Sequence, residues 1–138
     1  MEKIIFDAKE AIVGRLGTVV AKELLRGNEV IVLNSEESIM SGNKEVVVNK
    51  LKRLKKMGQG ASMKGPKIIK SSDRLLKRMI RGMLPWDKPR GREAYKRLKC
   101  YIGIPKTIEG NDLKKIKKIS NKLPRKFSKL KEISSQLS

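Results

Sequence analysis

The first third of the chain alternates between two hydrophobic periods. A β-prone run at Ile4–Phe6 and an aliphatic run at Val30–Leu33 predict short strands, and the second run has the continuous apolar character of a strand covered on both faces in a parallel sheet. Between them, a turn at Gly14–Gly17 leads into a predicted helix that ends at Gly27. The apolar residues that recur at helical spacing are Leu16, Val19, Val20 and Leu24. Together these segments predict a βαβ unit of about 30 residues.

A strongly amphipathic helix is predicted over residues 72–84. Its apolar side consists of Leu75, Leu76, Met79, Ile80 and Met83, and the opposite side carries Arg74, Lys77, Arg78 and Arg81. No acidic residue lies between Arg74 and Arg81, so neighbouring charges on this side repel one another. The basic side is either a solvated surface or a binding face, and the uncompensated repulsion favours a binding face for an anionic partner.

Pro85 ends this helix, and a second basic helix is predicted after a turn-rich loop. The loop spans Trp86–Gly91, and the second helix carries Arg92, Lys96 and Arg97. Trp86 either packs beneath the loop or stacks on a base, and we favour packing. Lys99–Ile102 then predicts another short strand, which closes an α/β fold with helices packed on a small sheet.

Two further regions differ in character from this unit. After a turn or cap at Ser41–Asn43, a helix is predicted with Val47, Leu51 and Leu54 facing inward, and the Gly-rich loop 58–66 that follows is expected to order on a partner. Beyond Pro105, helical spacing of apolar residues among many lysines predicts two more helices, one marked by Leu113, Ile116 and Ile119 and the other by Phe127, Leu130, Ile133 and Leu137. They are interpreted as an arm laid over RNA or a neighbouring protein; the alternative is that they pack back onto the domain.

The charge distribution points to a polyanionic partner. The 138 residues carry a net charge of +20, with an isoelectric point near 10.3. Residues 1–48 have a net charge of −2 and residues 49–138 one of +22, so the first third resembles a folding unit and the remainder its binding surface. Nucleic acid is the favoured partner and an acidic membrane the second choice. No apolar run is long enough to span a membrane and the N-terminus lacks a signal segment, which predicts a cytosolic protein.

Residue types that carry most enzymatic and metal chemistry are scarce. The chain has no histidine and a single cysteine, Cys100, which excludes an internal disulfide and a Cys/His zinc site and favours a buried structural thiol. Gly14–Gly17 lacks the spacing and lysine of a phosphate-binding loop, its match to the GxxG loop of KH domains is weak, and Gly58–Gly60 is followed by Met63 where a dinucleotide fingerprint needs glycine. Aromatic residues make up 4% of the chain, too few for a base-stacking platform. Binding is therefore expected to rest on phosphate and sugar contacts, without a cofactor.

The segment from Arg81 to Pro105 resembles the universal large-subunit ribosomal protein thirteen family in its archaeal and eukaryotic form. The resemblance is most specific in the RGMLP block at 81–85 and the KPRG block at 88–91, and it covers about residues 4–105. Earlier blocks agree in order, including Gly14-Arg15-Leu16 and Ser41-Gly42-Asn43-Lys44. Gly17 departs from the alanine that is usual in the family.

The resemblance implies a three-layer α/β/α domain around a small parallel four-stranded sheet at residues 1–105. Residues 106–138 match no part of the family pattern and are interpreted, from their own lysines and apolar spacing, as a basic helical arm. The resemblance also implies a structural, non-enzymatic protein of the large ribosomal subunit in the cytoplasm. Such a protein is monomeric within the ribosome, contacts large-subunit rRNA and neighbouring ribosomal proteins, supports subunit assembly, and has neither a membrane partner nor a small-molecule substrate. The alternatives are an mRNA-binding regulator away from the ribosome, a nucleotide-dependent transferase and a DNA-packaging protein.

Candidate RNA-binding residues come from both lines of argument. The family resemblance implies Arg15, Lys44, Lys64, Arg81, Lys88, Arg90, Arg92, Arg97 and Lys99. The basic helix face adds Arg74, Lys77 and Arg78, and the remaining candidates are Lys96 on the second basic helix and Lys67 beside the Gly-rich loop.

Overall fold

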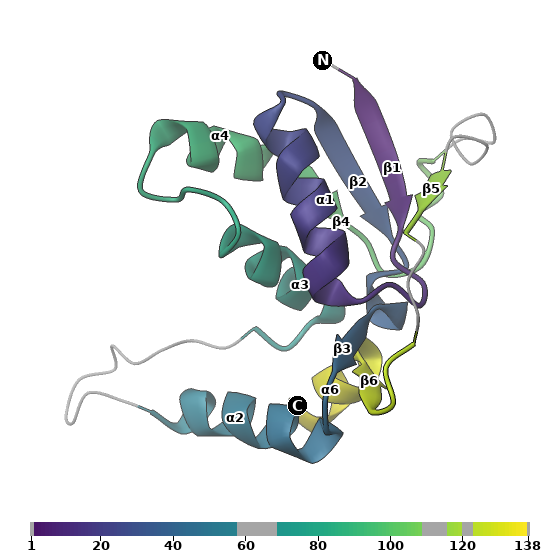
Figure 1. Ribbon diagram of the computed structural model, residues 1–138, viewed down its shortest axis with the longest axis vertical. Helices are drawn as coiled ribbons and strands as arrows, with labels where there is room; N and C mark the ends of the chain where they lie inside the picture. The colour runs from purple at the N-terminus through teal and green to yellow at the C-terminus, as the bar shows by residue number, and fades with distance from the viewer. Residues whose placement is uncertain (1, 58–68, 109–115, 120–122, 138) are drawn as a thin grey trace.

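A four-stranded parallel sheet forms the centre of the protein in the computed structural model (Figure 1), which describes residues 2–57, 69–108, 116–119 and 123–137. The strands are β1 (Lys3–Asp7), β2 (Glu29–Leu33), β4 (Leu98–Cys100) and β5 (Ile116–Lys118), in the order β4-β2-β1-β5. All three pairings are parallel. The predicted α/β fold with a small parallel four-stranded sheet is therefore confirmed, as is the βαβ unit at its start.

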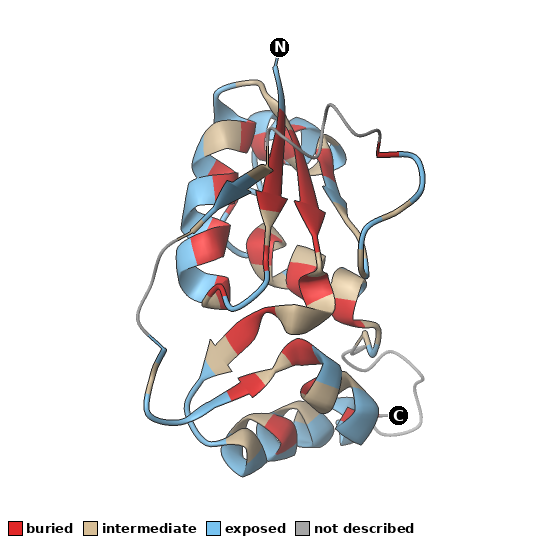
Figure 2. Ribbon diagram, turned by 90° about the vertical axis from the view of Figure 1, so that its right-hand side faces the viewer, coloured by how far each residue is buried: buried red, intermediate tan, exposed pale blue. Residues whose placement is uncertain are grey.

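Three helices share a core with one face of this sheet. They are α1 (Val13–Leu25), α3 (Ser72–Arg81) and α4 (Pro89–Lys96). The alternate strand residues Ile4, Phe6, Val30 and Val32 belong to the same buried cluster as helix residues such as Leu16, Leu76 and Ile80. Figure 2, turned by 90° from Figure 1, shows the buried central strands of the sheet with one helix beside them and others behind.

The opposite face of the sheet has its own apolar cluster. Ile5, Ile31 and Leu33 are buried there together with Ile108, and Tyr101 packs against them. Within the described residues, the second covering layer of the expected three-layer arrangement is thus formed by the segment 101–108. Because both faces are covered, all four residues from Val30 to Leu33 are buried, as their continuous apolar run predicted.

A smaller lobe lies below the sheet in Figures 1 and 2. It contains β3 (Ile39–Ser41) paired antiparallel with β6 (Phe127–Lys129), the short 3-10 helix η1 (Ser35–Glu37), α2 (Lys44–Lys56) and α6 (Leu130–Leu137). The side chain of Asn43 accepts a hydrogen bond of 3.1 Å from the backbone N–H of Glu45, which confirms the predicted cap of α2.

The segment beyond residue 105 differs from its prediction in two ways. Residues 116–118 form strand β5 and not a helix, because they pair with β1 and the sheet ladder overrides the local helical spacing. Leu130, Ile133 and Leu137 of α6 are buried in the main core cluster. Of the two arrangements considered for this segment, the described residues therefore adopt the one that packs back onto the domain. The division at residue 105 stays a prediction.

Element boundaries near the basic region also shift. Helix α3 ends at Arg81 and not near residue 84, while α4 begins at Pro89, within the segment predicted as a loop. Proline is favoured in the first turn of a helix because its missing N–H has no helical partner there. Strand β4 ends at Cys100, two residues before the predicted end. Across the parts of the chain that the structure describes, no helix has the length and apolar character needed to cross a membrane.

Candidate nucleic-acid interface

Helix α3 separates its apolar and basic sides as the sequence predicted. Leu75, Leu76 and Ile80 are buried in the core, whereas Arg74 and Arg78 are exposed, and Lys77 and Arg81 are partly covered. Met83 is the exception. It was predicted to face the core, and the end of its side chain does reach α1 beside Gly17, but the residue lies past the end of α3 and is 40% exposed.

The partly covered cations of α3 lie on aromatic rings. The guanidinium carbon of Arg81 is 4.0 Å from the centroid of the Trp86 ring, and the ammonium nitrogen of Lys77 is 4.8 Å from the centroid of the Tyr95 ring. The two rings meet edge to face, with their centroids 5.2 Å apart and an interplanar angle of 89°. This cation–π arrangement joins α3, the loop and α4 into one surface.

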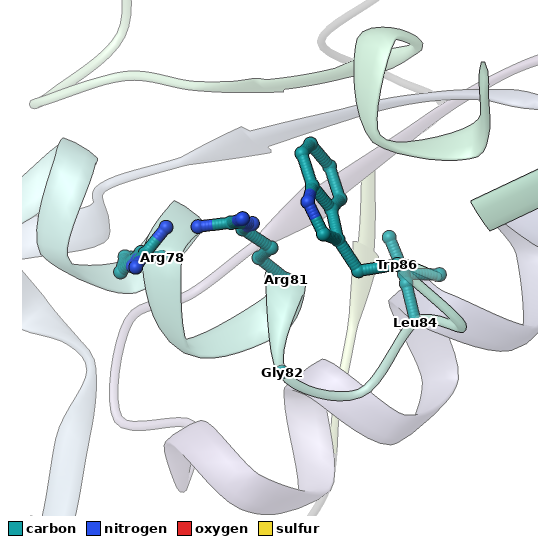
Figure 3. Close-up of a pocket in the computed structure, with 5 residues that line it drawn as sticks. All are labelled: Arg78, Arg81, Gly82, Leu84 and Trp86. Carbon is teal, nitrogen blue, oxygen red and sulfur yellow. The ribbon is translucent and has the colours of Figure 1, made fainter. Parts of the chain in front are cut away.

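A hollow of about 350 Å³ opens beside Trp86 (Figure 3). It is lined by Arg78, Arg81, Gly82, Leu84 and Trp86. In the view of Figure 3 the guanidinium of Arg81 lies between that of Arg78 and the indole ring. Among the described residues neither arginine has an ion pair with an acidic side chain, so the hollow carries uncompensated positive charge.

The loop between α3 and α4 is held by a series of hydrogen bonds. The backbone N–H groups of Trp86 and Lys88 donate to the carbonyl oxygens of Leu84 and Pro85, at 2.8 and 3.0 Å. The Nε of Arg92 donates to the Trp86 carbonyl at 2.9 Å. Gly91 is buried so close to this loop that an added Cβ would lie 2.1 Å from the Pro85 carbonyl oxygen. Only glycine therefore permits this approach of α4 to the loop.

A second hollow of about 220 Å³ lies at the other end of α3. Its lining includes Arg74, Lys77 and Lys99, together with Asp73, Cys100 and Tyr101. Cys100 was predicted to be a buried structural thiol; it is partly buried and packs against the core, and burial raises the pKa of its thiol to about 12. Lys99 also forms a 3.5 Å ion pair with Glu29 on the neighbouring strand, so part of its charge is compensated.

Several of the predicted RNA-binding residues lie outside the two hollows beside α3. Arg97 donates from a terminal guanidinium nitrogen to the Leu24 carbonyl at 2.7 Å, which satisfies a carbonyl at the end of α1. Lys44 lines a separate hollow in the small lobe with Arg125, Lys126 and Phe127. Arg15 is exposed in the first turn of α1, while Lys88, Arg90 and Lys96 are exposed at or beside α4. Lys64 and Lys67 lie outside the described residues.

Two lysines near the C-terminus are paired with an acid that sequence reasoning did not connect to them. The ammonium groups of Lys129 and Lys131 lie 2.8 and 3.1 Å from the Glu37 carboxylate oxygens. The hydrogen bond from Lys129, followed by that from Lys131, lowers the pKa of Glu37 below its usual value. These residues are more than 90 positions apart, so no local pattern indicates the pairing.

Comparison with known proteins shows the family to which this chain is similar. The family model described as Ribosomal protein L13 matches residues 1–107. The chain belongs to the ribosomal protein L13 family. Membership agrees with the resemblance noted in the sequence, and this is a family of ribosomal proteins and not a class of enzymes. Within the described residues, no group of three or more acidic, cysteine or histidine side chains could hold a metal ion.

Several archaeal relatives of this L13-family chain are named large ribosomal subunit protein uL13. The Methanocaldococcus jannaschii protein is 41% identical over 136 residues, covering 96% of both chains. The Methanopyrus kandleri protein is 44% identical over 108 residues, covering 78% of this chain and 67% of the relative. The Archaeoglobus fulgidus protein is 39% identical over 112 residues, with coverages of 81% and 70%. The first of these matches extends past residue 105, so similarity to a family member continues into the C-terminal segment.

Proposed function

We propose that this protein is a structural constituent of the large ribosomal subunit in the cytoplasm and binds large-subunit rRNA through the surface of α3, the 82–88 loop and α4. The observation that carries the proposal is the cationic face of α3, which has no ion pair to an acid among the described residues and is fixed on a buried α/β core. Membership of the L13 family and the names of its relatives support the ribosomal assignment.

The α/β core acts as a rigid mount for this surface. Arg74, Arg78 and Arg81 present planar guanidinium groups that suit bidentate contacts to phosphate. Lys77, Lys88, Arg90, Arg92, Lys96 and Lys99 extend the positive surface across the loop, α4 and the adjacent strand. By neutralising phosphates of RNA segments that repel one another, the protein stabilises their close approach during subunit assembly. Contacts to neighbouring ribosomal proteins are part of the same proposal.

Salt dependence tests the extended surface. If about eight phosphates are neutralised, a plot of log K against log salt concentration should have a slope of about −6 to −7 for rRNA fragments. A slope near −2 would contradict a surface spanning α3 and α4. The measurement should use the full chain with duplex and single-stranded fragments at matched salt.

Sedimentation tests the ribosomal role independently of the site. In a sucrose gradient of cell lysate, the protein should migrate with the large subunit at physiological salt and remain there after a high-salt wash. Recovery mainly in light fractions at physiological salt would favour the alternative of an mRNA-binding regulator that uses the same surface.

A further inference from the structure

The hollow beside Trp86 has an apolar, aromatic part that phosphate binding alone does not require. Trp86 is 36% exposed although it is the largest apolar side chain in the region, and its ring is held in a fixed orientation by the edge-to-face contact with Tyr95. Leu84 is buried and contributes a further apolar part of the lining. The hollow therefore offers a rigid aromatic surface that is partly open to solvent.

The two arginines add a cationic part to the same hollow. Arg81 is stacked over one face of the Trp86 ring, with its guanidinium carbon 4.0 Å from the ring centroid, and Arg78 lines the hollow beside it (Figure 3). Their positive charges repel each other, and no described acid compensates them by an ion pair. An anion between the two guanidinium groups would relieve this repulsion. A flat π surface adjacent to an anion site matches the two halves of a nucleotide.

We infer that this hollow holds a single unpaired RNA nucleotide, with its base stacked on the exposed part of the Trp86 ring and its phosphate between Arg78 and Arg81. The inference rests on the proposed RNA-binding function and specifies what the surface recognises. In an A-form duplex the bases are stacked on their neighbours and their faces are inaccessible. The site thus selects a bulged, looped or single-stranded nucleotide, whereas the remaining cations of α3 and α4 contact phosphates of any RNA.

The single tryptophan of the chain makes the site directly observable. The first experiment titrates the full protein with an unstructured single-stranded RNA oligonucleotide and with a blunt RNA duplex of equal length, at one salt concentration. Anisotropy of a label on the RNA measures binding, and intrinsic fluorescence reports the environment of Trp86. The single strand should quench the fluorescence saturably, in parallel with the anisotropy, while the duplex should bind with little quenching. Binding of the single strand without any change in fluorescence would overturn the inference.

Variants separate stacking from charge. Trp86→Leu should weaken single-strand binding by roughly 5-fold to 100-fold, leave duplex binding within about twofold, and leave the salt slope unchanged. Trp86→Phe should recover most of the loss because it retains a ring, and Arg81→Lys should be intermediate because it keeps the charge but not the plane. The matched control Lys50→Ala removes one exposed cation from α2 and should affect both RNAs equally.

The outcomes also distinguish the inference from the function on which it rests. Equal weakening of both RNAs by Trp86→Leu, or no weakening of either, would show that the hollow does not hold a base, even if the protein binds RNA. No anisotropy change with either RNA would instead contradict the proposed function itself. Circular dichroism of each variant excludes loss of fold as the cause of a weaker signal.

Discussion

Basic residues serve opposite purposes in two regions of this protein. On α3, Arg74 and Arg78 are exposed and have no ion pair to a described acid. In the C-terminal segment, Lys129 and Lys131 pair with Glu37, and α6, which includes Lys131, buries its apolar side in the core. The same residue types therefore form the proposed polyanion-binding surface in one place and are paired with an acid within the fold in the other. Charge density alone does not distinguish the two regions, whereas the presence or absence of a partner acid does.

The largest effect is expected from removing a buried apolar side chain of α6, the helix through which the C-terminal segment packs onto the core. Ile133 is fully buried, so Ile133→Ala should lower the free energy of unfolding by about 2–5 kcal/mol, through lost burial and the cavity that remains. Chemical denaturation with circular dichroism measures the loss. The control Gln136→Ala, at an exposed position of the same helix, should change stability by less than about 0.5 kcal/mol. A loss of RNA affinity without a loss of stability in Ile133→Ala would mean that α6 is a binding arm after all.

The complementary change on α3 should affect binding and not folding. Replacing Arg74 and Arg78 with alanine removes two candidate phosphate contacts and should weaken rRNA binding by about 3 kcal/mol, or roughly 100-fold, and reduce the salt slope by about 1.5. Stability should stay within about 1 kcal/mol, since exposed and self-repelling charges contribute little to folding.

The double variant Lys129→Ala and Lys131→Ala is the matched control, because it removes the same total charge from the C-terminal segment, where the lysines pair with Glu37. It should lower stability more than RNA affinity. If both double variants weakened RNA binding equally, net charge would govern binding and the comparison between the two regions would fail.

Gly91 links the fold to the binding surface. In Gly91→Ala the new Cβ would meet the Pro85 carbonyl, so the loop or α4 must shift, at a cost of about 1–3 kcal/mol. Because Trp86 lies in that loop, RNA affinity should fall as well. Gly14→Ala is the control: an added Cβ there has nothing within 4 Å, and alanine in a helix should be neutral or stabilising by up to about 1 kcal/mol. Unchanged stability and affinity in Gly91→Ala would show that the loop is not held in place by this contact.

The sequence predicted those parts of the structure that depend on local pattern. The βαβ unit follows from two aliphatic runs flanking a helical spacing, and the two sides of α3 follow from residues that recur along one helix. The same logic failed at residues 116–118, where helical spacing was overruled by pairing with β1. It also missed β3 and β6, three-residue strands whose residues pair with each other across most of the chain.

In the candidate site, too, some features could be predicted from local sequence and others could not. The cations of α3 could be identified from their spacing and from the family resemblance. The hydrogen bond of Arg97 to the Leu24 carbonyl could not, because it joins residues 73 positions apart and nothing near Arg97 indicates an internal partner. The same is true of Lys129 with Glu37. Local sequence shows where charge is, whereas the fold decides which charges are already paired.

The smallest expected effect concerns the acid that pairs with the C-terminal lysines. The pKa of Glu37 is lowered in the folded protein, so its carboxylate stabilises the fold fully above the unfolded-state pKa of roughly 4.3 and progressively less as the pH falls through the folded value. Glu37→Gln should therefore lower the melting temperature slightly at pH 7, and the difference from the parent protein should shrink toward zero at more acidic pH. The control Glu93→Gln changes an exposed carboxylate on α4 that has no ion pair among the described residues, and it should leave the melting temperature at pH 7 nearly unchanged. Melting curves between neutral and acidic pH decide the matter. A difference for Glu37→Gln that persisted unchanged under acid would mean that Glu37 acts through packing, and the charge pairing that distinguishes the C-terminal segment from α3 would lose its support.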